Sequence, residues 1–181
     1  MQVTNQSPTK AQPGLPWYGL RVRSRCEAVV TASLQGKGYE PFFASYPVRR
    51  RRSDRIKQID VPLFPGYVFC RIDITHRLPV LTTPGIVEIV GIGKVPAPID
   101  DSEIEAVQKV LAVGLPPQAW PFVHTGDRVQ VVHGPLRGVE GVVVSVQNRQ
   151  HLVVSITLLQ RSVSVALDPS WVRTVQAVGR Q

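Results

Sequence analysis

Apolar and polar positions near the start of the chain form a pattern that predicts a strand followed by a helix. Leu20 and Val22 alternate with two arginines, as in a strand that buries one face. Ser24 and Glu27 have the spacing of a capping box, so we expect the helix to begin at Ser24. The apolar residues that follow, Val30 among them, recur at four-residue spacing and would form one buried face.

The next part of the chain predicts a long basic hairpin. The run from Tyr39 to Val48 has strand composition, weakened by Pro41, and leads into the basic segment RRRRSDRIKQID. Because this segment lies between two strand-like runs, a β-hairpin arm is its expected form. The stretch VPLFPGYVFCRID has strand character only in its second half, since Pro62 and Pro65 lack the backbone donor that regular pairing needs.

Further elements complete an N-terminal domain. GIVEIVG predicts a buried strand, and THRLPVLTTPG before it predicts a short helix or an irregular turn. In PIDDSEIEAVQKVLAVG, Asp100 has the place of an N-cap, and Ile104, Val107 and Leu111 form an apolar stripe. The order of strand, helix, several strands and helix predicts an α+β fold, an α/β sandwich in which an antiparallel sheet is flanked by helices.

The C-terminal part has a different pattern. The segment GLPPQAWPF contains three prolines and no regular period, which is typical of a linker. After it, short Val-rich runs alternate with turn signals such as Gly-Pro and Asp-Pro, which predicts a small β-barrel. We therefore expect a disordered tail, a first domain, a linker and a barrel, at residues 1–15, 16–113, 114–122 and 123–177.

Composition narrows the function to binding. The net charge of +8 and the pI near 10.1 suit a polyanionic partner such as nucleic acid. Cys26 and Cys70 belong to no CxxC or Cys/His cluster, so we expect no metal site, no disulfide framework and a reducing, cytoplasmic setting. No apolar run approaches the ~20 residues that span a bilayer. The histidines are scattered, and neither a phosphate loop nor a nucleophile elbow occurs, so we expect no catalysis and no cofactor.

Several motifs in a fixed order carry a resemblance to a known family. WYGLRVRSRCEAVVTASL, PLFPGYVFCRID, PGIVEIVG, PAPIDDSEIEAV and GDRVQVVHGPLRGVEGVV follow one another along Trp17 to Val175. In this order the chain resembles the NusG family of transcription elongation factors, with an NGN domain and a five-stranded KOW barrel. The resemblance implies a monomer that binds the clamp helices of the largest RNA polymerase subunit, reduces pausing and suppresses termination.

The resemblance also implies which residues contact polymerase. They are Tyr18, Phe64, Tyr67, Phe69, Ile89, Ile104 and Val107. Pro65 and Gly66 would hold Phe64 and Tyr67 stiffly for another protein to contact, and rigid aromatics are frequent interface anchors. The alternative is a place in the core, which the helical stripe favours for Ile104 and Val107 and which stays open for Phe69.

A basic arm is the candidate nucleic-acid contact. Its cations are Arg49, Arg50, Arg51, Arg52, Arg55 and Lys57. Guanidinium groups fork onto phosphates, so the arm would contact upstream or non-template DNA; the alternative is a solvated hairpin tip without a ligand. His76 coincides with a loop that touches the opposite polymerase wall in RfaH-type members. The neighbouring residues differ from that loop, and we favour an exposed turn histidine.

The barrel is expected to dock a further factor. By resemblance its contacts are Leu158, Leu159 and Arg161, and the partner is a small-subunit ribosomal protein or Rho. Leu159 stands where general members commonly carry an aromatic, which favours a specialised, RfaH-type paralogue that suppresses termination. A housekeeping NusG that couples polymerase to Rho or the ribosome, and a ribosomal-type RNA-binding protein, remain the alternatives. The run GVEGVVVSVQ is poor in helix formers, so we expect the barrel to be β rather than helical.

Overall fold

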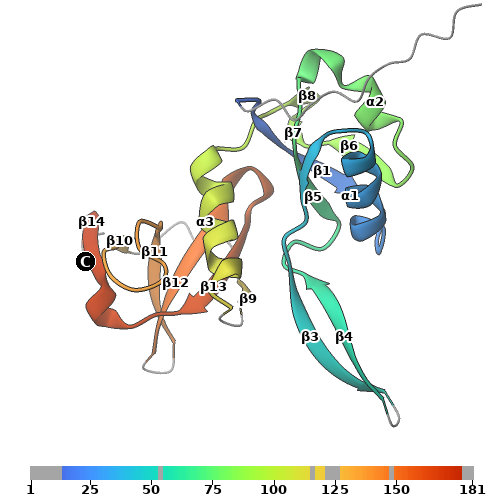
Figure 1. Cartoon of the computed structure of the whole chain (residues 1–181). Coiled ribbons are helices and arrows are strands. Elements are labelled where there is room, and N and C mark those ends of the chain that lie inside the picture. Colours follow the sequence, from blue (N-terminus) through green and yellow to red (C-terminus); the bar gives the residue numbers. More distant parts are fainter. Residues whose placement is uncertain (1–13, 53–54, 115–116, 121–126, 147–148, 177–181) are drawn as a thin grey trace, which may run out of the picture. The chain divides into compact units, whose positions relative to one another are not determined.

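The computed structural model describes residues 14–52, 55–114, 117–120, 127–146 and 149–176 (Figure 1). Contacts divide the chain into two units. Unit 1 contains the described residues up to Phe43 together with Pro65–Pro98, and unit 2 contains Ala44–Phe64 and the described residues from Ile99 onward. The predicted tail lies largely outside the described residues, as does part of the predicted linker.

Unit 1 contains a four-stranded antiparallel sheet in the order β2, β5, β1, β6. Its strands are β1 (Trp17–Val22), β2 (Glu40–Phe42), β5 (Tyr67–Arg71) and β6 (Ile86–Ile89). Its other elements are α1 (Glu27–Gly36), the 3-10 turn η1 (Ile74–His76), α2 (Leu78–Leu81) and the paired short strands β7 (Gly91–Ile92) and β8 (Val95–Pro96). The mixed α and β composition predicted for the N-terminal part is confirmed.

The core of unit 1 lies between the sheet and α1. Alternate residues of β1 and β5, among them Leu20 and Val68, pack with Val30 and Leu34 of α1 and with Val80 of α2. The apolar residues at every second position of the strands thus pack against the apolar residues at four-residue spacing on the helix. The buried faces that the sequence predicts for β1 and α1 are the ones that form this core.

Two local expectations for the N-terminal part are wrong. The helix begins at Glu27, with Cys26 as N-cap and no side-chain cap, so Ser24 forms no capping box. The predicted strand from Tyr39 to Val48 is two strands, because β2 pairs with β5 whereas β3 (Ser45–Arg52) pairs with β4 (Arg55–Pro62). Local composition predicts strand on both sides of this break but contains no information about a change of partner.

The predicted basic hairpin is present. β3 and β4 form a two-stranded antiparallel ribbon whose register runs from Ser45 opposite Pro62 to Arg52 opposite Arg55 (Figure 1). The ribbon ends just before Leu63, whose amide donates to the Ala44 carbonyl at 2.8 Å. Pairing therefore stops at the prolines of the PLFPGY motif, as the sequence predicts.

Unit 2 also contains α3 (Asp101–Ala112) and a six-stranded antiparallel sheet, here called the C-terminal sheet, in the order β14, β10, β11, β12, β13, β9. Its strands are β9 (Gln118–Trp120), β10 (Asp127–Val131), β11 (Glu140–Val146), β12 (Arg149–Ile156), β13 (Arg161–Ala166) and β14 (Val172–Gln176), with 3-10 turns η2 (Thr157–Leu159) and η3 (Pro169–Trp171). Among the residues described from 117 onward, the only helices are these two short turns, so the expectation of strands is confirmed.

The sheet has one strand more than the five predicted. β9 comes from the segment predicted as a linker, and it forms because Gln118 and its neighbours pair with Ser162, Val163 and Ser164 of β13. This pairing is tertiary, which explains why the local pattern of the segment shows no strand period.

Helix α3 packs on the C-terminal sheet. Asp100 is its N-cap, as predicted, although its side chain makes no capping hydrogen bond. Glu103 accepts from the Thr157 amide at 3.2 Å and from its hydroxyl at 2.5 Å, which joins the first turn of α3 to the end of β12. The contacts thus group α3 with the C-terminal sheet, whereas the sequence predicts it in the domain 16–113; the predicted boundaries stay a prediction. Within the described ranges, no helix is long and apolar enough to cross a membrane.

Candidate functional site

The turn at Pro65 and Gly66 is held on both sides of its glycine. Gly66 has φ +83, and a proline followed by such a glycine is the signature of a type II turn. The Gly66 carbonyl accepts from the Val22 amide at 2.8 Å, and the Gly66 amide donates to Glu27 Oε1 at 2.9 Å. A Cβ at Gly66 would lie 3.8 Å from the Val22 carbonyl oxygen, so the glycine is needed for its conformation rather than for space.

Glu27 is a buried carboxylate that sequence reasoning assigned to a helix cap. Its side chain belongs to the first turn of α1, where the helix dipole favours negative charge, and the residue is 7% exposed. The structure directs this carboxylate to the turn instead. The sequence does contain a signal for this burial. Glu27 has the spacing that places it on the same helix face as Val30 and Leu34, so it is a charged residue within an apolar stripe.

An aromatic trio, Trp17, Phe42 and Phe69, lies on the sheet face opposite the core. Phe42 stacks on Phe69 with ring centroids 6.0 Å apart, and Trp17 meets Phe42 edge to face at 6.4 Å. Gly19 stands directly opposite Phe69 in the β1–β5 register. Each such pair contributes about 0.5–1.5 kcal/mol beyond its burial. The sequence prediction included Phe69 but missed Trp17 and Phe42.

Ion pairs flank the aromatic trio. The Arg71 guanidinium lies 4.7 Å from the Trp17 ring centroid, and its Nε is 3.7 Å from Glu40 Oε2. On the neighbouring strand pair, Arg21 Nε and Glu88 Oε1 are 2.7 Å apart, with both side chains about half exposed. The exposed Arg21–Glu88 pair contributes ~0–1 kcal/mol, because solvent screens such pairs.

Three of the predicted polymerase contacts lie around the turn. Phe64 precedes it and is 1% exposed, so its ring is buried rather than presented at the surface. Tyr67 follows the turn and is half-buried, and Phe69, two residues further along β5, is fully buried on the same sheet face. Tyr67 is therefore the most exposed aromatic of the motif.

The other predicted contacts do not join that face. Tyr18 belongs to the core cluster, and Ile89 packs against it, because both point to the α1 side of the sheet. Ile104 and Val107 are fully buried on α3 in unit 2. In a strand, neighbouring residues face opposite sides, so a set chosen by sequence similarity splits between two faces. The role of all seven residues in polymerase binding stays a prediction.

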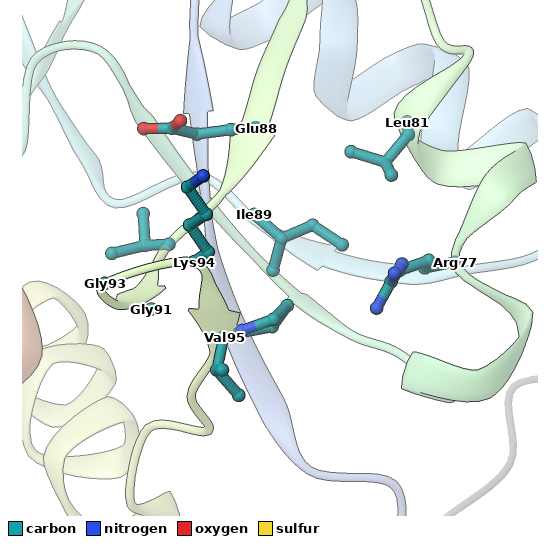
Figure 2. A pocket seen from close by; sticks show the side chains of 10 residues that line it. Arg77, Leu81, Glu88, Ile89, Gly91, Gly93, Lys94 and Val95 are labelled. Carbon is teal, nitrogen blue, oxygen red and sulfur yellow. The ribbon is translucent and has the colours of Figure 1, made fainter.

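A cavity of ≈ 410 Å³ lies beside β6 and the β7–β8 pair in unit 1 (Figure 2). Its lining consists of Arg77, Leu81, Glu88, Ile89, Val90, Gly91, Gly93, Lys94, Val95 and Pro96. A Cβ at Gly91 would lie 1.9 Å from the Val95 carbonyl oxygen, so only glycine permits this close pairing. The lining mixes apolar side chains such as Leu81 and Ile89 with the charged ends of Arg77, Glu88 and Lys94.

His76 lies in an exposed hydrogen-bonded turn, where the sequence predicts it. Asp73 Oδ1 accepts from the Thr75 amide at 2.9 Å, and Asp73 Oδ2 is 2.9 Å from His76 Nδ1. Hydrogen bonds from Thr75, and then from His76, lower the pKa of Asp73 to about 2. Among the described residues, no cluster of histidine, cysteine, aspartate or glutamate could hold a metal ion.

The basic hairpin places like charges opposite one another. In the backbone register, Arg50 stands opposite Lys57 and Arg52 stands opposite Arg55. Arg49 is exposed and stands opposite Gln58. The side chains from Arg50 to Lys57 lie outside what the structure describes. Like charges at directly opposite positions destabilise a strand pair, and an anion between the strands' cations would relieve that repulsion.

The predicted docking segment of the C-terminal sheet spans η2 and the start of β13. Leu158 and Leu159 are half-buried, and Arg161 is exposed. Gln160 between them has φ +50, which closes the turn in the left-handed region. Thr157, in the same turn, is the residue that binds Glu103, so the segment lies next to the contact of α3 with the sheet.

The sequence of the chain is similar to those of several known proteins. The chain matches the family described as "Transcription termination factor nusG" over residues 15–108. It is 31% identical to the transcription termination/antitermination protein NusG of Thermus thermophilus, over 87% of this chain and 97% of that protein. The corresponding protein of Escherichia coli K12 is 33% identical, over 88% of this chain and 96% of that protein. The solved structure "Domain interaction in Thermotoga maritima NusG" has a TM-score of 0.48 and 23% identity, and covers 89% of this chain and 97% of that one.

Proposed function

Because this chain belongs to the NusG family of transcription termination and antitermination proteins, we propose that it binds RNA polymerase during elongation. Proteins of this family are transcription factors rather than enzymes. The N-terminal part contacts the clamp helices of the largest subunit, reduces pausing and suppresses termination. The C-terminal sheet docks a further factor through Leu158, Leu159 and Arg161.

The clamped turn before Tyr67 carries this proposal. Both backbone groups of Gly66 are hydrogen-bonded within unit 1, so the turn is ordered before any partner arrives. An ordered contact segment loses little conformational entropy on binding, which leaves more of the interaction energy as affinity. On the same face of β5, the buried ring of Phe69 stacks on Phe42 beside Tyr67 and packs the strand that presents it.

A binding measurement tests the contact. Truncating an aromatic anchor typically costs about 2 kcal/mol or more, or about 30-fold in the dissociation constant. We expect Tyr67→Ala to weaken binding to core RNA polymerase by that factor in a titration with labelled protein. Tyr46→Ala, at a half-buried tyrosine of β3, is the matched control and should bind like the wild type. Equal affinity of the wild type and a folded Tyr67→Ala variant would refute the contact.

The β3–β4 hairpin contacts upstream or non-template DNA. Its run of cations, with like charges opposite one another, supports an anionic ligand. Replacing Arg49 to Arg52 by alanine should lower the salt dependence of binding to an elongation complex by about 0.9 in log–log slope for each phosphate that these arginines neutralise. A matched control removes the same number of exposed arginines elsewhere, at Arg23, Arg25, Arg128 and Arg137. An unchanged slope in the hairpin variant would exclude the DNA contact.

A general NusG role is the second candidate, and the names of the curated relatives favour it. Leu159, in place of a common aromatic, favours the antiterminator. Transcription of a template with a Rho-dependent terminator separates the two roles. The antiterminator increases readthrough when the purified protein is added, whereas the housekeeping factor increases termination in the presence of Rho.

A further inference from the structure

Glu27 has a place that a helix-capping role does not explain. It lies in the first turn of α1 and is only 7% exposed, and burial of a charged group is unfavourable unless a polar partner compensates it. The hydrogen bond that it makes is to the Gly66 amide, 39 residues further along the chain. The buried carboxylate of Glu27 thus binds the peptide group between Pro65 and Gly66 of the PLFPGY motif.

We propose that Glu27 is a positioning residue, which fixes the peptide group between Pro65 and Gly66 so that Tyr67 is presented to RNA polymerase in one conformation. The proposal rests on the proposed function, because it adds a residue to the same contact. Glu27 itself contacts no partner in this scheme. It acts through the turn.

The geometry explains why this peptide group needs an external acceptor. Type I and type II turns differ by a flip of their central peptide, and the flip reverses the direction of the amide at the third position, here Gly66. Glycine adopts φ of either sign readily, so Gly66 alone does not select one turn. The carboxylate of Glu27 selects the orientation with φ +83, in which the amide points toward α1.

The second backbone contact anchors the other side of the same residue. The Val22 amide donates to the Gly66 carbonyl, and Arg21, the residue before Val22, stands opposite Tyr67 in the β1–β5 register. With Glu27 in place, the turn is therefore fixed, and β5 begins to pair with β1 at Tyr67. Without it, Gly66 samples both turn types, and the apparent affinity falls by the fraction of molecules in the binding-competent form.

A series of variants at one position separates acceptor geometry from charge. Glu27→Gln keeps an oxygen acceptor at the same reach, Glu27→Asp keeps the charge but is one methylene too short, and Glu27→Ala removes both. We expect Glu27→Ala and Glu27→Asp to weaken binding to core RNA polymerase about tenfold, whereas Glu27→Gln stays within about threefold of the wild type. Glu140→Ala, at an exposed glutamate of β11, is the matched control and should bind like the wild type.

Two further readouts distinguish positioning from a general loss of stability. Hydrogen exchange at the Gly66 amide should become at least about tenfold faster in Glu27→Ala, while urea unfolding verifies that the chain is folded under the binding conditions. In a Tyr67→Ala background, Glu27→Ala should cause no additional loss of binding, because both changes affect the same contact.

Each outcome decides the proposal. Wild-type affinity in a folded Glu27→Ala or Glu27→Asp variant overturns it, as does an equal loss in Glu27→Gln, or an additive loss in the Tyr67→Ala background. If Glu27→Ala does not fold, the aspartate and glutamine variants decide by the same comparison. If the wild type does not bind polymerase, the proposed function fails, and unchanged Gly66 exchange in Glu27→Ala or Glu27→Asp would then overturn the positioning role separately.

Discussion

Replacing Gly66 by alanine isolates the conformational requirement of the turn from any steric one. An L-residue at φ +83 has an unfavourable contact between its Cβ and its own backbone, which costs about 1–2 kcal/mol. The neighbourhood adds little, because the new Cβ would lie 3.8 Å from the Val22 carbonyl oxygen, an ordinary van der Waals separation. We therefore expect Gly66→Ala to lower the free energy of unfolding of unit 1 by about 1–2 kcal/mol.

The assay is urea unfolding of the full chain followed by circular dichroism and tryptophan fluorescence, to which the buried Trp17 of unit 1 contributes. Gly36→Ala is the control, since Gly36 ends α1 and a Cβ added there would have no neighbour within 4 Å. Alanine at this position should leave stability unchanged or raise it by up to about 1 kcal/mol. Gly66→Asn should fall between alanine and glycine, because asparagine tolerates positive φ.

Two results would refute the reasoning. No loss of stability in Gly66→Ala would mean that the residue does not need positive φ in solution. A loss greater than about 4 kcal/mol would mean that the side chain meets an obstacle closer than the Val22 carbonyl, because backbone strain alone costs about 1–3 kcal/mol.

Three other predictions test the packing of side chains inside unit 1 and inside unit 2. Burial raises the pKa of the Cys70 thiol to about 12, so Ellman's reagent at pH 8 should leave this thiol unmodified in the native chain and modify it in urea; modification without denaturant would contradict the burial. Glu103→Ala should destabilise the contact of α3 with the C-terminal sheet by about 1 kcal/mol, seen as faster hydrogen exchange at the Thr157 amide, and unchanged exchange would exclude the contact. Gly134→Ala would place a Cβ 2.7 Å from the Trp171 ring at φ +76, so we expect a loss of about 2–4 kcal/mol in urea unfolding, with a change in near-ultraviolet circular dichroism from the displaced indole; wild-type stability would show that the ring is not packed there.

The elements that the sequence predicts correctly depend on local patterns. β1, the β3–β4 hairpin and the start of α3 after Asp100 each have a period, a turn or a cap within a few neighbouring residues. The strand β9 and the division between β2 and β3 depend instead on which strand each of them pairs with. The local sequence of these residues does not indicate that partner.

The candidate site divides in the same way. The turn at Pro65 and Gly66 follows from the residue types, since a proline followed by a glycine favours a backbone with positive φ at the second residue. The sheet face toward which Tyr18 or Phe69 points depends on the strand register. A change of register by one residue would move every side chain of the strand to the other face. The bond from Glu27 joins segments far apart in the chain, so spacing alone suggested a nearby cap instead.

The strand β9 changes how α3 is tethered. α3 ends at Ala112 and β9 begins at Gln118, so five residues, 113–117, connect the helix to a strand of the sheet that it packs on. The six Cα-to-Cα steps from Ala112 to Gln118 span at most about 22 Å, which gives the two surfaces a high effective concentration for each other. The hydrogen bonds from Glu103 to Thr157 and the buried side chains of α3 thus act between surfaces that are already tethered, and any ligand for the apolar stripe of α3 has to compete with a neighbour that cannot diffuse away.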